Sequence, residues 1–424
     1  MRKVLALSFF LVFLPFLASA ESCFDYYKFQ SVEIDLHGEK QIYKAGEGAK
    51  FIGSLTNKNS HPLVGGSLIL RVSKLDPRSM VGNDIIDEWV AKENINLLAG
   101  ERQFVNIPYQ LQSGFPAGTY VLTSYFLTQN KFNISGLSFT DDIYGGYTTF
   151  TLEGSGEKSI RFDRTGVKVD GKNYRIFGFL PMVFPDDTQT LKVGVPLKNE
   201  TGKNLSASVF YSLYAWDAAS RENLIKSWSE KVDLGAGASK ILPADLDVVG
   251  RPVYFLKIKA QAGDKQSEIH IRFVKEGFRP RLNDVGITQF PLASGNKAAI
   301  FACYHNTTDG VGGGKLEVGL KTPSGRTITE AKYEGQITGA IDVLAKDVRN
   351  SAFDKLTLSA KLYDDKNNLV DAVEILYDCS AFSEPLCLKS KINWYLLSAG
   401  ILIAAAALYF LLKHFRNKDI QPTP

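Results

Sequence analysis

The sequence is poor in the residues that most often carry catalysis. Among its 424 residues are only five histidines, four cysteines and three methionines. The histidines that precede residue 392 are scattered, without a ligand-type partner at metal-binding spacing: His37, His61, His270 and His305. Neither H-E-x-x-H nor G-x-S-x-G occurs. The sequence therefore predicts no catalytic residue, no metal site and no cofactor, and we expect a protein that is not an enzyme.

Long helical periodicities are almost absent before residue 392, and short alternating runs take their place. In Thr190–Asn199 the apolar residues Leu191, Val193, Val195 and Leu197 alternate with residues that can face water. This alternation predicts strands with one face on a core. His270, between Ile269 and Ile271, is by the same rule expected at an exposed strand position. Glycine and asparagine cluster between the runs, so the sequence predicts an all-β fold.

The two ends of the chain carry targeting signals. Arg2 and Lys3 precede an apolar stretch that ends at the A-x-A sequence Ala18–Ala20, so residues 1–20 are predicted to be a cleaved signal peptide, with an uncleaved anchor as the alternative. Residues 392–412 contain no charge and, as a helix, would be about 30 Å long. They are predicted to be a single transmembrane helix. Gly400 and Ala404 offer close helix packing and hence a homo-oligomer.

Charge excludes one class of partner. Seven of the 49 lysines and arginines lie in the signal peptide or beside the span, whereas only one of the 45 acidic residues lies outside Glu21–Leu388. The segment between the two signals is therefore slightly acidic despite the net charge of +4. Nucleic-acid binding is not supported. The predicted location is the cytoplasmic membrane, with residues 21–388 outside and a cytoplasmic tail at 413–424.

An ordered set of strands recurs three times. The first strand of each copy ends on an asparagine, and these are Asn57, Asn199 and Asn306. The spacing predicts three tandem immunoglobulin-like β-sandwiches at residues 21–154, 155–277 and 278–380, followed by a juxtamembrane linker at 381–391. An insertion in the first copy, Lys74–Asn96, is expected to hold a short helix. The domains are expected to form a rod.

The motifs of the first copy are similar to those of CARDB-type adhesion-related repeats. Asn57 is followed in order by Leu98-Ala99-Gly100-Glu101 and Gly118-Thr119-Tyr120, whereas the second and third copies keep less of this pattern. The acidic, Asn-rich ending common in that family is missing. The resemblance implies tandem β-sandwiches and a role in adhesion.

The four cysteines, in an exported chain, allow three full disulfide pairings. In an immunoglobulin-like order, Cys379 and Cys303 would lie at opposite ends of neighbouring strands, beyond disulfide reach. Cys379 and Cys387 are therefore the preferred pair, closing a short loop before the membrane. Cys303 is expected to be a buried thiol, and Cys23 to be free or intermolecular.

Other residues suggest modification or binding. Four N-x-S/T sequons are candidate glycosylation sites: Asn133, Asn199, Asn204 and Asn306. A distal aromatic stretch is a candidate contact surface, with a core strand pair as the alternative: Phe132, Phe139, Tyr144, Tyr147 and Phe150. Asp186 and Asp187 are the best placed acids for calcium, although aspartate is also common in turns. Gly310–Lys315 lacks the Ser or Thr of a phosphate loop and is expected to be a flexible loop.

The expected function is display of tandem β-sandwiches at the cell surface for adhesion, scaffolding, or binding of an extracellular protein or glycan. The alternative is an accessory subunit of a membrane transport or secretion complex. The sequence does not separate the two.

Overall fold

The chain is built almost entirely of β-strands, which confirms the predicted all-β class. The computed structural model describes residues 22–26, 32–75, 83–130, 146–154, 158–174, 182–215, 219, 221–251, 253–293, 297–307, 310–348, 352–382 and 402–409. We divide the strands into an N-terminal lobe (β1–β8), a middle lobe (β9–β18) and a C-terminal lobe (β19–β25). Two sheets face each other in every lobe.

The N-terminal lobe follows a short helix, α2 (Cys23–Tyr26). Its strands are β1 (Val32–Gly38), β2 (Ile42–Lys44), β3 (Gly48–Asn57), β4 (Leu63–Lys74), β5 (Asp84–Leu97), β6 (Arg102–Gln110), β7 (Gly118–Leu127) and β8 (Gly146–Glu153). One sheet has the order β1-β3-β6. The other has the order β5-β4-β7-β8-β2, and it continues beyond β5 into the middle lobe.

The middle lobe consists of β9 (Ile160–Phe162), β10 (Lys168–Val169), β11 (Lys172–Asn173), β12 (Met182–Phe184), β13 (Thr190–Asn199), β14 (Leu205–Ala215), β15 (Leu224–Leu234), β16 (Ser239–Asp247), β17 (Val253–Ala262) and β18 (Lys265–Lys275), with 3-10 turns at Arg164–Gly166 and Arg221–Asn223. One sheet runs β11-β10-β13-β16, with β9 also paired to β13. The other runs β15-β14-β17-β18, and β18 lies beside β5 of the N-terminal lobe. A ten-stranded sheet thus spans both lobes.

The C-terminal lobe consists of β19 (Pro280–Ile287), β20 (Ala298–Asn306), β21 (Gly312–Lys321), β22 (Thr327–Ile337), β23 (Asp342–Val348), β24 (Lys355–Asp364) and β25 (Leu369–Asp378), followed by a 3-10 turn at Cys379–Ala381. Its sheets have the orders β19-β20-β23 and β22-β21-β24-β25. The glycine-rich run expected to be a loop partly belongs to a strand, because Gly312–Gly314 open β21.

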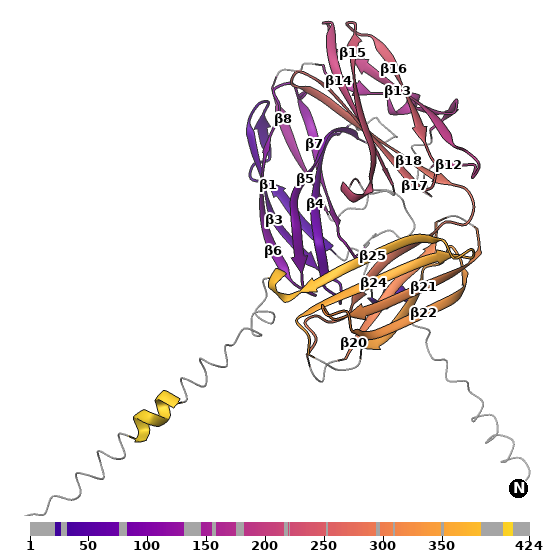
Figure 1. Cartoon of the computed structure of the whole chain (residues 1–424). Coiled ribbons are helices and arrows are strands. Elements are labelled where there is room, and N and C mark those ends of the chain that lie inside the picture. Colours follow the sequence, from indigo (N-terminus) through magenta and orange to yellow (C-terminus); the bar gives the residue numbers. More distant parts are fainter. Residues whose placement is uncertain are drawn as a thin grey trace, which may run out of the picture.

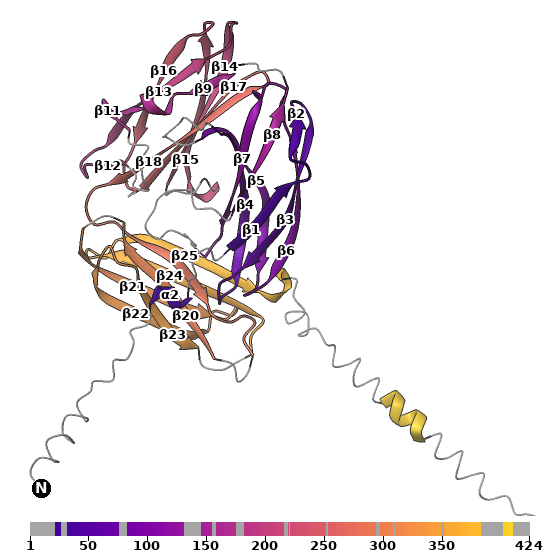
Figure 2. The same ribbon diagram turned by 180° about the vertical axis from the view of Figure 1, so that it is seen from behind.

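The lobes form a triangle, so the expected rod is wrong. Figures 1 and 2 show the C-terminal lobe lying across the base of both other lobes, with α2 against its β20. The reason is that the N-terminal lobe packs on both other lobes, through β5 on one side and through α2, His61 and Asn130 on the other.

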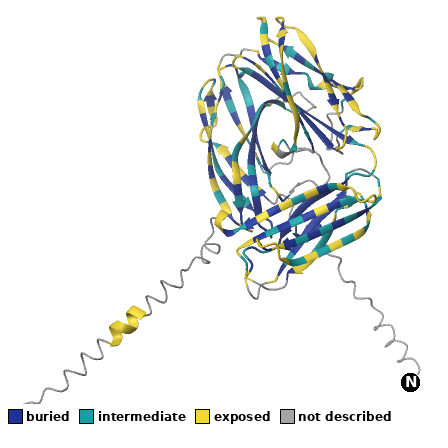
Figure 3. Ribbon diagram, in the orientation of Figure 1, coloured by how far each residue is buried: buried dark blue, intermediate teal, exposed yellow. Residues whose placement is uncertain are grey.

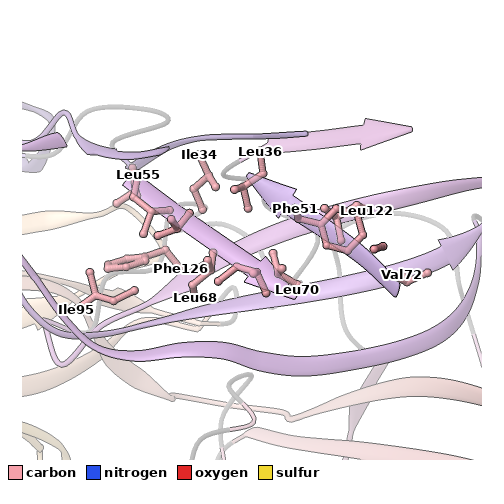
Figure 4. Close-up of a cluster of buried hydrophobic side chains, with 14 of the residues drawn as sticks. Ile34, Leu36, Phe51, Leu55, Leu68, Leu70, Val72, Ile95, Leu122 and Phe126 are labelled. Carbon is pink, nitrogen blue, oxygen red and sulfur yellow. The ribbon is translucent and has the colours of Figure 1, made fainter. Parts of the chain in front are cut away.

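Alternation fills the cores as the sequence predicts. In β13 the buried residues are the predicted Leu191, Val193, Val195 and Leu197. The core of the N-terminal lobe collects side chains from both of its sheets, including Leu55 and Phe51 from β3 and Leu70 from β4 (Figure 4). Burial of such side chains, at about 25 cal/mol per Å² of apolar area, is the main force that holds each pair of sheets together.

The insertion Lys74–Asn96 does not hold the expected helix within its described residues, because β5 occupies Asp84–Leu97. Apolar residues at Ile85, Ile86, Trp89 and Val90 have a helix-like spacing, but β5 accommodates them by irregular pairing. Its register against β4 shifts four times. Such bulges bend a strand and re-aim its side chains. The strand stays paired with β4 over its length and meets β18 of the middle lobe at Ile85.

Only residues 402–409 of the predicted span 392–412 are described; they are helical and exposed (Figure 3). In the described ranges, no helix has the length and apolar character needed to cross a membrane. The transmembrane helix therefore stays a prediction.

Candidate functional site

The most distinctive group of side chains lies where β4 and β5 of the N-terminal lobe meet β17 and β18 of the middle lobe. Arg71 and Glu88 are cross-strand partners in β4 and β5, and Lys257 and His270 are partners in β17 and β18. Because side chains alternate along a strand, partners point to the same face of the sheet. We call the set Arg71, Glu88, Lys257, Glu268, His270 and Arg272 the junction network.

Two carboxylates are held between cations in the junction network. Arg71 donates from Nε and Nη2 to Glu88 Oε2 at 2.9 and 2.8 Å. The Lys257 ammonium lies 3.0 Å from Glu88 Oε1 and 3.0 Å from Glu268 Oε1. Glu88 therefore bridges two lobes, since it accepts from Arg71 in its own lobe and from Lys257 in the other. Charge-assisted bonds of this kind are about twice as strong as neutral ones.

His270 is buried at the centre of the junction network, which corrects the expected exposed position. Its Nδ1 lies 3.0 Å from Arg71 Nη2, and its Nε2 lies 2.6 Å from Glu268 Oε1. Since a guanidinium can only donate, Nδ1 accepts from Arg71 and Nε2 donates to Glu268. These partners select the neutral tautomer with its proton on Nε2. The imidazole also meets the Phe255 ring edge to face at 5.0 Å.

Burial and neighbouring charges shift the pKa values of side chains in the junction network. Burial, together with nearby Arg71, lowers the pKa of His270. Burial alone would raise the pKa of Glu88, but the surrounding cationic groups, among them Arg71 and Lys257, outweigh it and lower that pKa. Burial, and then Arg71, lower the pKa of Arg272 to about 9. Near neutral pH the network thus holds three cations, two carboxylates and a neutral imidazole.

Glu88, Glu268 and His270 offer ligand-type atoms within 4.8 Å of one another. A metal ion is nevertheless a poor fit, because the Lys257 ammonium already lies between the two carboxylates and His270 Nε2 carries the proton that a metal would replace. A divalent metal ion would add two positive charges to a network in which cations already outnumber carboxylates. The arrangement is therefore an ion-pair network, and we assign no metal or cofactor to it.

A second pair continues the charged contact along β5. Lys259 of β17 donates to Asp87 Oδ1 at 2.6 Å, and Tyr109 of β6 donates to Asp87 Oδ2 at 3.1 Å. The Tyr109 ring stacks on Trp89 with 4.3 Å between ring centroids. This second contact ties both sheets of the N-terminal lobe to the middle lobe.

The junction between the N-terminal and C-terminal lobes is covalent and apolar. A disulfide joins Cys23 and Cys303, which corrects the expected free Cys23 and the expected Cys303 thiol. The Phe301 ring stacks on Tyr26 at 4.5 Å and meets His61 edge to face at 4.9 Å. Phe301 and Cys303 accordingly belong to the hydrophobic cluster of the N-terminal lobe.

Buried polar contacts complete this junction. His61 Nε2 lies 3.3 Å from Asp284 Oδ2, and both side chains are almost fully buried. The Asn130 side chain accepts from the backbone N–H of Val64 and donates to Val285 O and to the Tyr377 hydroxyl. One amide thus ties two lobes through three partners. A buried amide that satisfies both donors and acceptor in this way fixes a single arrangement of its neighbours.

The three repeated asparagines close equivalent turns. Asn57, Asn199 and Asn306 are buried, and each Nδ2 donates to the carbonyl four residues later, at His61, Lys203 and Gly310. Asn57 also donates to Leu97 and Leu98, and Asn199 to the corresponding Leu234 and Gly235. The sequence pattern predicted a turn at these positions, but not that the amide also binds the loop before the next strand.

The structure places the predicted disulfide and glycosylation residues as follows. Cys379 is disulfide-bonded, but Cys387 lies outside the described residues, so their pairing stays a prediction. The Asn199 and Asn306 amides are buried and bonded within the protein, whereas Asn204 is exposed. Since a glycan needs a free amide nitrogen, Asn204 is the most accessible of the described candidates. Asn133 lies outside the described residues, and glycosylation at all four stays a prediction.

The predicted contact residues are separated by the fold. Tyr147 is 69% exposed on β8, whereas Phe150 is buried in the core of the N-terminal lobe. Phe132, Phe139 and Tyr144 lie outside the described residues. Asp186, proposed with Asp187 for calcium, is ion-paired with Arg279. Asp364 caps the hairpin turn between β24 and β25.

No family model matches the sequence, and no curated protein matches it. Solved structures share partial likeness. Escherichia coli alpha-2-macroglobulin in its native conformation is 12% identical over 88% of this chain and 24% of that chain, with a TM-score of 0.32. Red sea bream transglutaminase is 11% identical over 51% and 31%, with a TM-score of 0.24. The DNA-bound Pseudomonas fluorescens alkylpurine DNA glycosylase AlkC is 15% identical over 29% and 31%, with a TM-score of 0.23.

This chain therefore spans less than a third of the length of each of these three proteins. At such TM-scores the likeness carries no argument about the fold or the function of this chain.

Proposed function

We propose that the chain is a non-catalytic surface protein, anchored by one transmembrane helix, that displays three tandem immunoglobulin-like domains outside the cell and binds an extracellular protein or glycan. The observation that carries this proposal is the Cys23–Cys303 disulfide. Stable disulfides belong to oxidising compartments outside the cytoplasm. The disulfide agrees with the signal peptide predicted at residues 1–20 and with residues 21–388 lying outside.

The arrangement of the lobes favours a preformed binding surface over a flexible tether. Each lobe encloses a hydrophobic cluster between two sheets, as an immunoglobulin-like sandwich does. The equivalent asparagine turns support an origin of the three lobes as copies of one unit. Contacts at both junctions of the N-terminal lobe hold the three lobes in fixed positions, which lowers the entropy lost on binding.

Export is tested on intact cells. A protease added from outside should cleave residues 21–388 while leaving a cytoplasmic marker whole. Peptide mapping without reductant should recover Cys23 and Cys303 in one linked peptide. Full protection of the chain on intact cells, or two alkylated cysteines, would contradict the proposed location.

Binding is tested by cross-linking in native membranes followed by mass spectrometry. Cross-links from the N-terminal lobe to proteins of other cells, to glycoproteins or to a second copy would support adhesion or scaffolding. Recurrent cross-links to polytopic proteins of the same membrane would instead make the chain an accessory subunit. Tyr147→Ala should reduce the adhesive cross-links, whereas Phe104→Ala, which removes an equally exposed aromatic ring from β6, should not.

A further inference from the structure

Few backbone pairs join the sheet of the N-terminal lobe to that of the middle lobe. Between β5 and β18 the register contains one residue pair, Ile85 with Glu268, whereas β17 and β18 are paired along their whole length. Among the described residues, the hydrophobic clusters of these two lobes share no member. The side chains of the junction network therefore supply much of what holds the two lobes as one sheet.

His270 occupies a position in this network where one added proton would place a donor against a donor. Its Nδ1 has no proton and accepts from Arg71 at 3.0 Å. The groups packed around it come from every neighbouring strand: Arg71 of β4, whose guanidinium lies over the Tyr125 ring of β7, Glu88 of β5, Lys257 and Phe255 of β17, and Glu268 and Arg272 of its own strand. Three of these are cations.

We propose that the junction network is an acid-responsive latch, in which protonation of His270 releases the middle lobe from the N-terminal lobe. A proton added at Nδ1 would point at the Arg71 guanidinium, so that two donors would face each other and their hydrogen bond would be lost. The imidazolium would also be a fourth cation against two carboxylates. Arg71 would have to turn away. The contact by which Arg71 orients Glu88 toward Lys257 would then be lost.

The junction with the C-terminal lobe lacks this response. There the neighbour of the His61 ring is the Asp284 carboxylate, an acceptor, and not a cation. The disulfide between Cys23 and Cys303 holds the same junction whatever the charge of nearby groups. Acid should therefore open the junction between the N-terminal and middle lobes and leave the junction with the C-terminal lobe closed. The middle lobe would stay attached through the chain between β18 and β19.

The sign of the titration agrees with this geometry. Burial and Arg71 lower the pKa of His270 in the closed state. An imidazole released to water regains an ordinary pKa near 6.5. The open state therefore binds more protons than the closed state as the pH falls below about 6.5, and the opening equilibrium constant rises by up to tenfold per pH unit. The hydrogen bond from Ser113 lowers the pKa of Asp264, so this contact at the rim of the junction stays intact over that interval.

Hydrogen exchange of the full-length protein in detergent tests the latch. Between pH 7.5 and pH 5.0, after correction for the intrinsic exchange rate, peptides covering β5 and β18 should exchange at least tenfold faster. Peptides covering β19 and β20 should accelerate much less, because the disulfide holds that junction. In His270→Gln, whose amide can donate to Glu268 and accept from Arg71 but cannot titrate, β5 and β18 should stay protected at both pH values.

Two matched variants serve as controls. His37→Gln changes an exposed histidine of β1, and His305→Gln changes a buried histidine of the C-terminal lobe. Both should keep the wild-type acid response of β5 and β18. If His270→Gln instead loses the same protection at low pH as the wild type does, another group controls the junction and the proposal fails.

A measurement on the unaltered protein covers the case in which His270→Gln does not fold. Nitrogen-15 spectra of histidine-labelled protein should show one ring protonated on Nε2 at neutral pH, and this ring should take up its second proton over the same pH interval in which β5 and β18 lose protection. A ring at this position that titrates without any change in exchange, or wild-type β5 and β18 that stay protected at pH 5.0, would overturn the latch.

Discussion

The N-terminal lobe meets its two neighbours in opposite ways. Toward the middle lobe it presents the charged junction network, and toward the C-terminal lobe it presents α2, the Phe301 contact and a disulfide. An apolar contact gains free energy from every buried carbon atom, whereas a buried ion pair regains in attraction roughly what desolvation costs. The apolar junction therefore contributes to stability, whereas the charged junction determines which side chains must pair.

The comparison also shows which junction can respond to its surroundings. The Phe301 contact and the disulfide carry no charge, so acid leaves these two parts of the junction with the C-terminal lobe unchanged. The junction network, in contrast, would change its hydrogen bonds when His270 takes up a proton. A protein built with both kinds can open at one place without coming apart at the other.

The apolar junction should show the largest loss on truncation. Phe301→Ala removes a ring that is buried against Tyr26 and His61, and we expect a loss of roughly 3–5 kcal/mol in the free energy of unfolding, as for other buried phenylalanines. Denaturant titration measures it. Phe104→Ala, at an exposed ring, should change stability by less than about 0.5 kcal/mol. A small loss at Phe301 would mean that this junction is not a continuation of the core.

Breaking the charged junction should cost about as much but affect different residues. Glu88→Ala leaves Arg71 and Lys257 buried without a bridging carboxylate, and removal of one partner from a buried pair costs roughly 3–5 kcal/mol. Hydrogen exchange should accelerate in β4, β5, β17 and β18. Replacing Arg71 and Glu88 together by apolar residues of similar size should recover most of the stability, because Lys257 then still pairs with Glu268. A double variant weaker than Glu88→Ala would contradict this account.

The covalent part of the apolar junction should contribute somewhat less. Cys23→Ser with Cys303→Ser opens a loop of 280 residues, and loss of a disulfide typically costs about 2–4 kcal/mol. Unfolding should be compared in the presence and absence of reductant, which should affect the wild type more than the variant. The His61–Asp284 contact and Asn130 should keep the lobes together in the folded variant, as small-angle scattering would show.

A buried histidine away from the junction network should make stability depend on pH without opening that junction. Burial, and then Arg281, lower the pKa of His305 to about 3. Since the unfolded chain takes up a proton near pH 6.5, stability should fall below that pH by up to about 1.4 kcal/mol per pH unit. Unfolding measured at pH 6.5, 5.5 and 4.5 should show a shallower slope in His305→Gln. An unchanged slope would assign the acid sensitivity to other groups.

The smallest effect is expected at the link between the middle and C-terminal lobes. Asp186 is largely exposed and pairs with Arg279. Exposed pairs contribute about 0–1 kcal/mol and are screened by salt. Asp186→Ala should therefore lower stability by less than about 1 kcal/mol, and less still in 1 M salt, when measured by thermal unfolding. A larger loss would make this link a third structural junction.

Contacts local in sequence were predictable, and contacts between lobes were not. Alternation placed Leu191, Val193, Val195 and Leu197 in a core, and the repeated asparagines located equivalent turns. His270 was assigned to solvent by the same alternation, which identifies two faces of a strand but not what covers the second face. A signal was present nonetheless: Glu268, His270 and Arg272 occupy successive positions on one face of β18, opposite Lys257 and Lys259, and such unlike charges indicate pairing.

The disulfide and the triangular arrangement of the lobes could not be predicted, because both depend on contacts between residues far apart in the sequence. Pairing of Cys23 with Cys303 requires the helix α2 to lie against the third set of strands, 280 positions away. No local pattern specifies such a distance. The helix expected in Lys74–Asn96 failed because four register shifts let β5 place neighbouring apolar residues without a helix.

The Cys23–Cys303 bond also determines what a protease can release. A single cut at any point between these residues leaves two pieces that are still joined through sulfur, so neither piece can diffuse away. A single cut after Cys303, in contrast, frees everything before it from the predicted anchor, unless the cut falls inside the short loop that the predicted Cys379–Cys387 disulfide would close. Release of the part that precedes the predicted anchor is thereby confined to cleavage after Cys303, and a molecule cut between Cys23 and Cys303 stays in one piece.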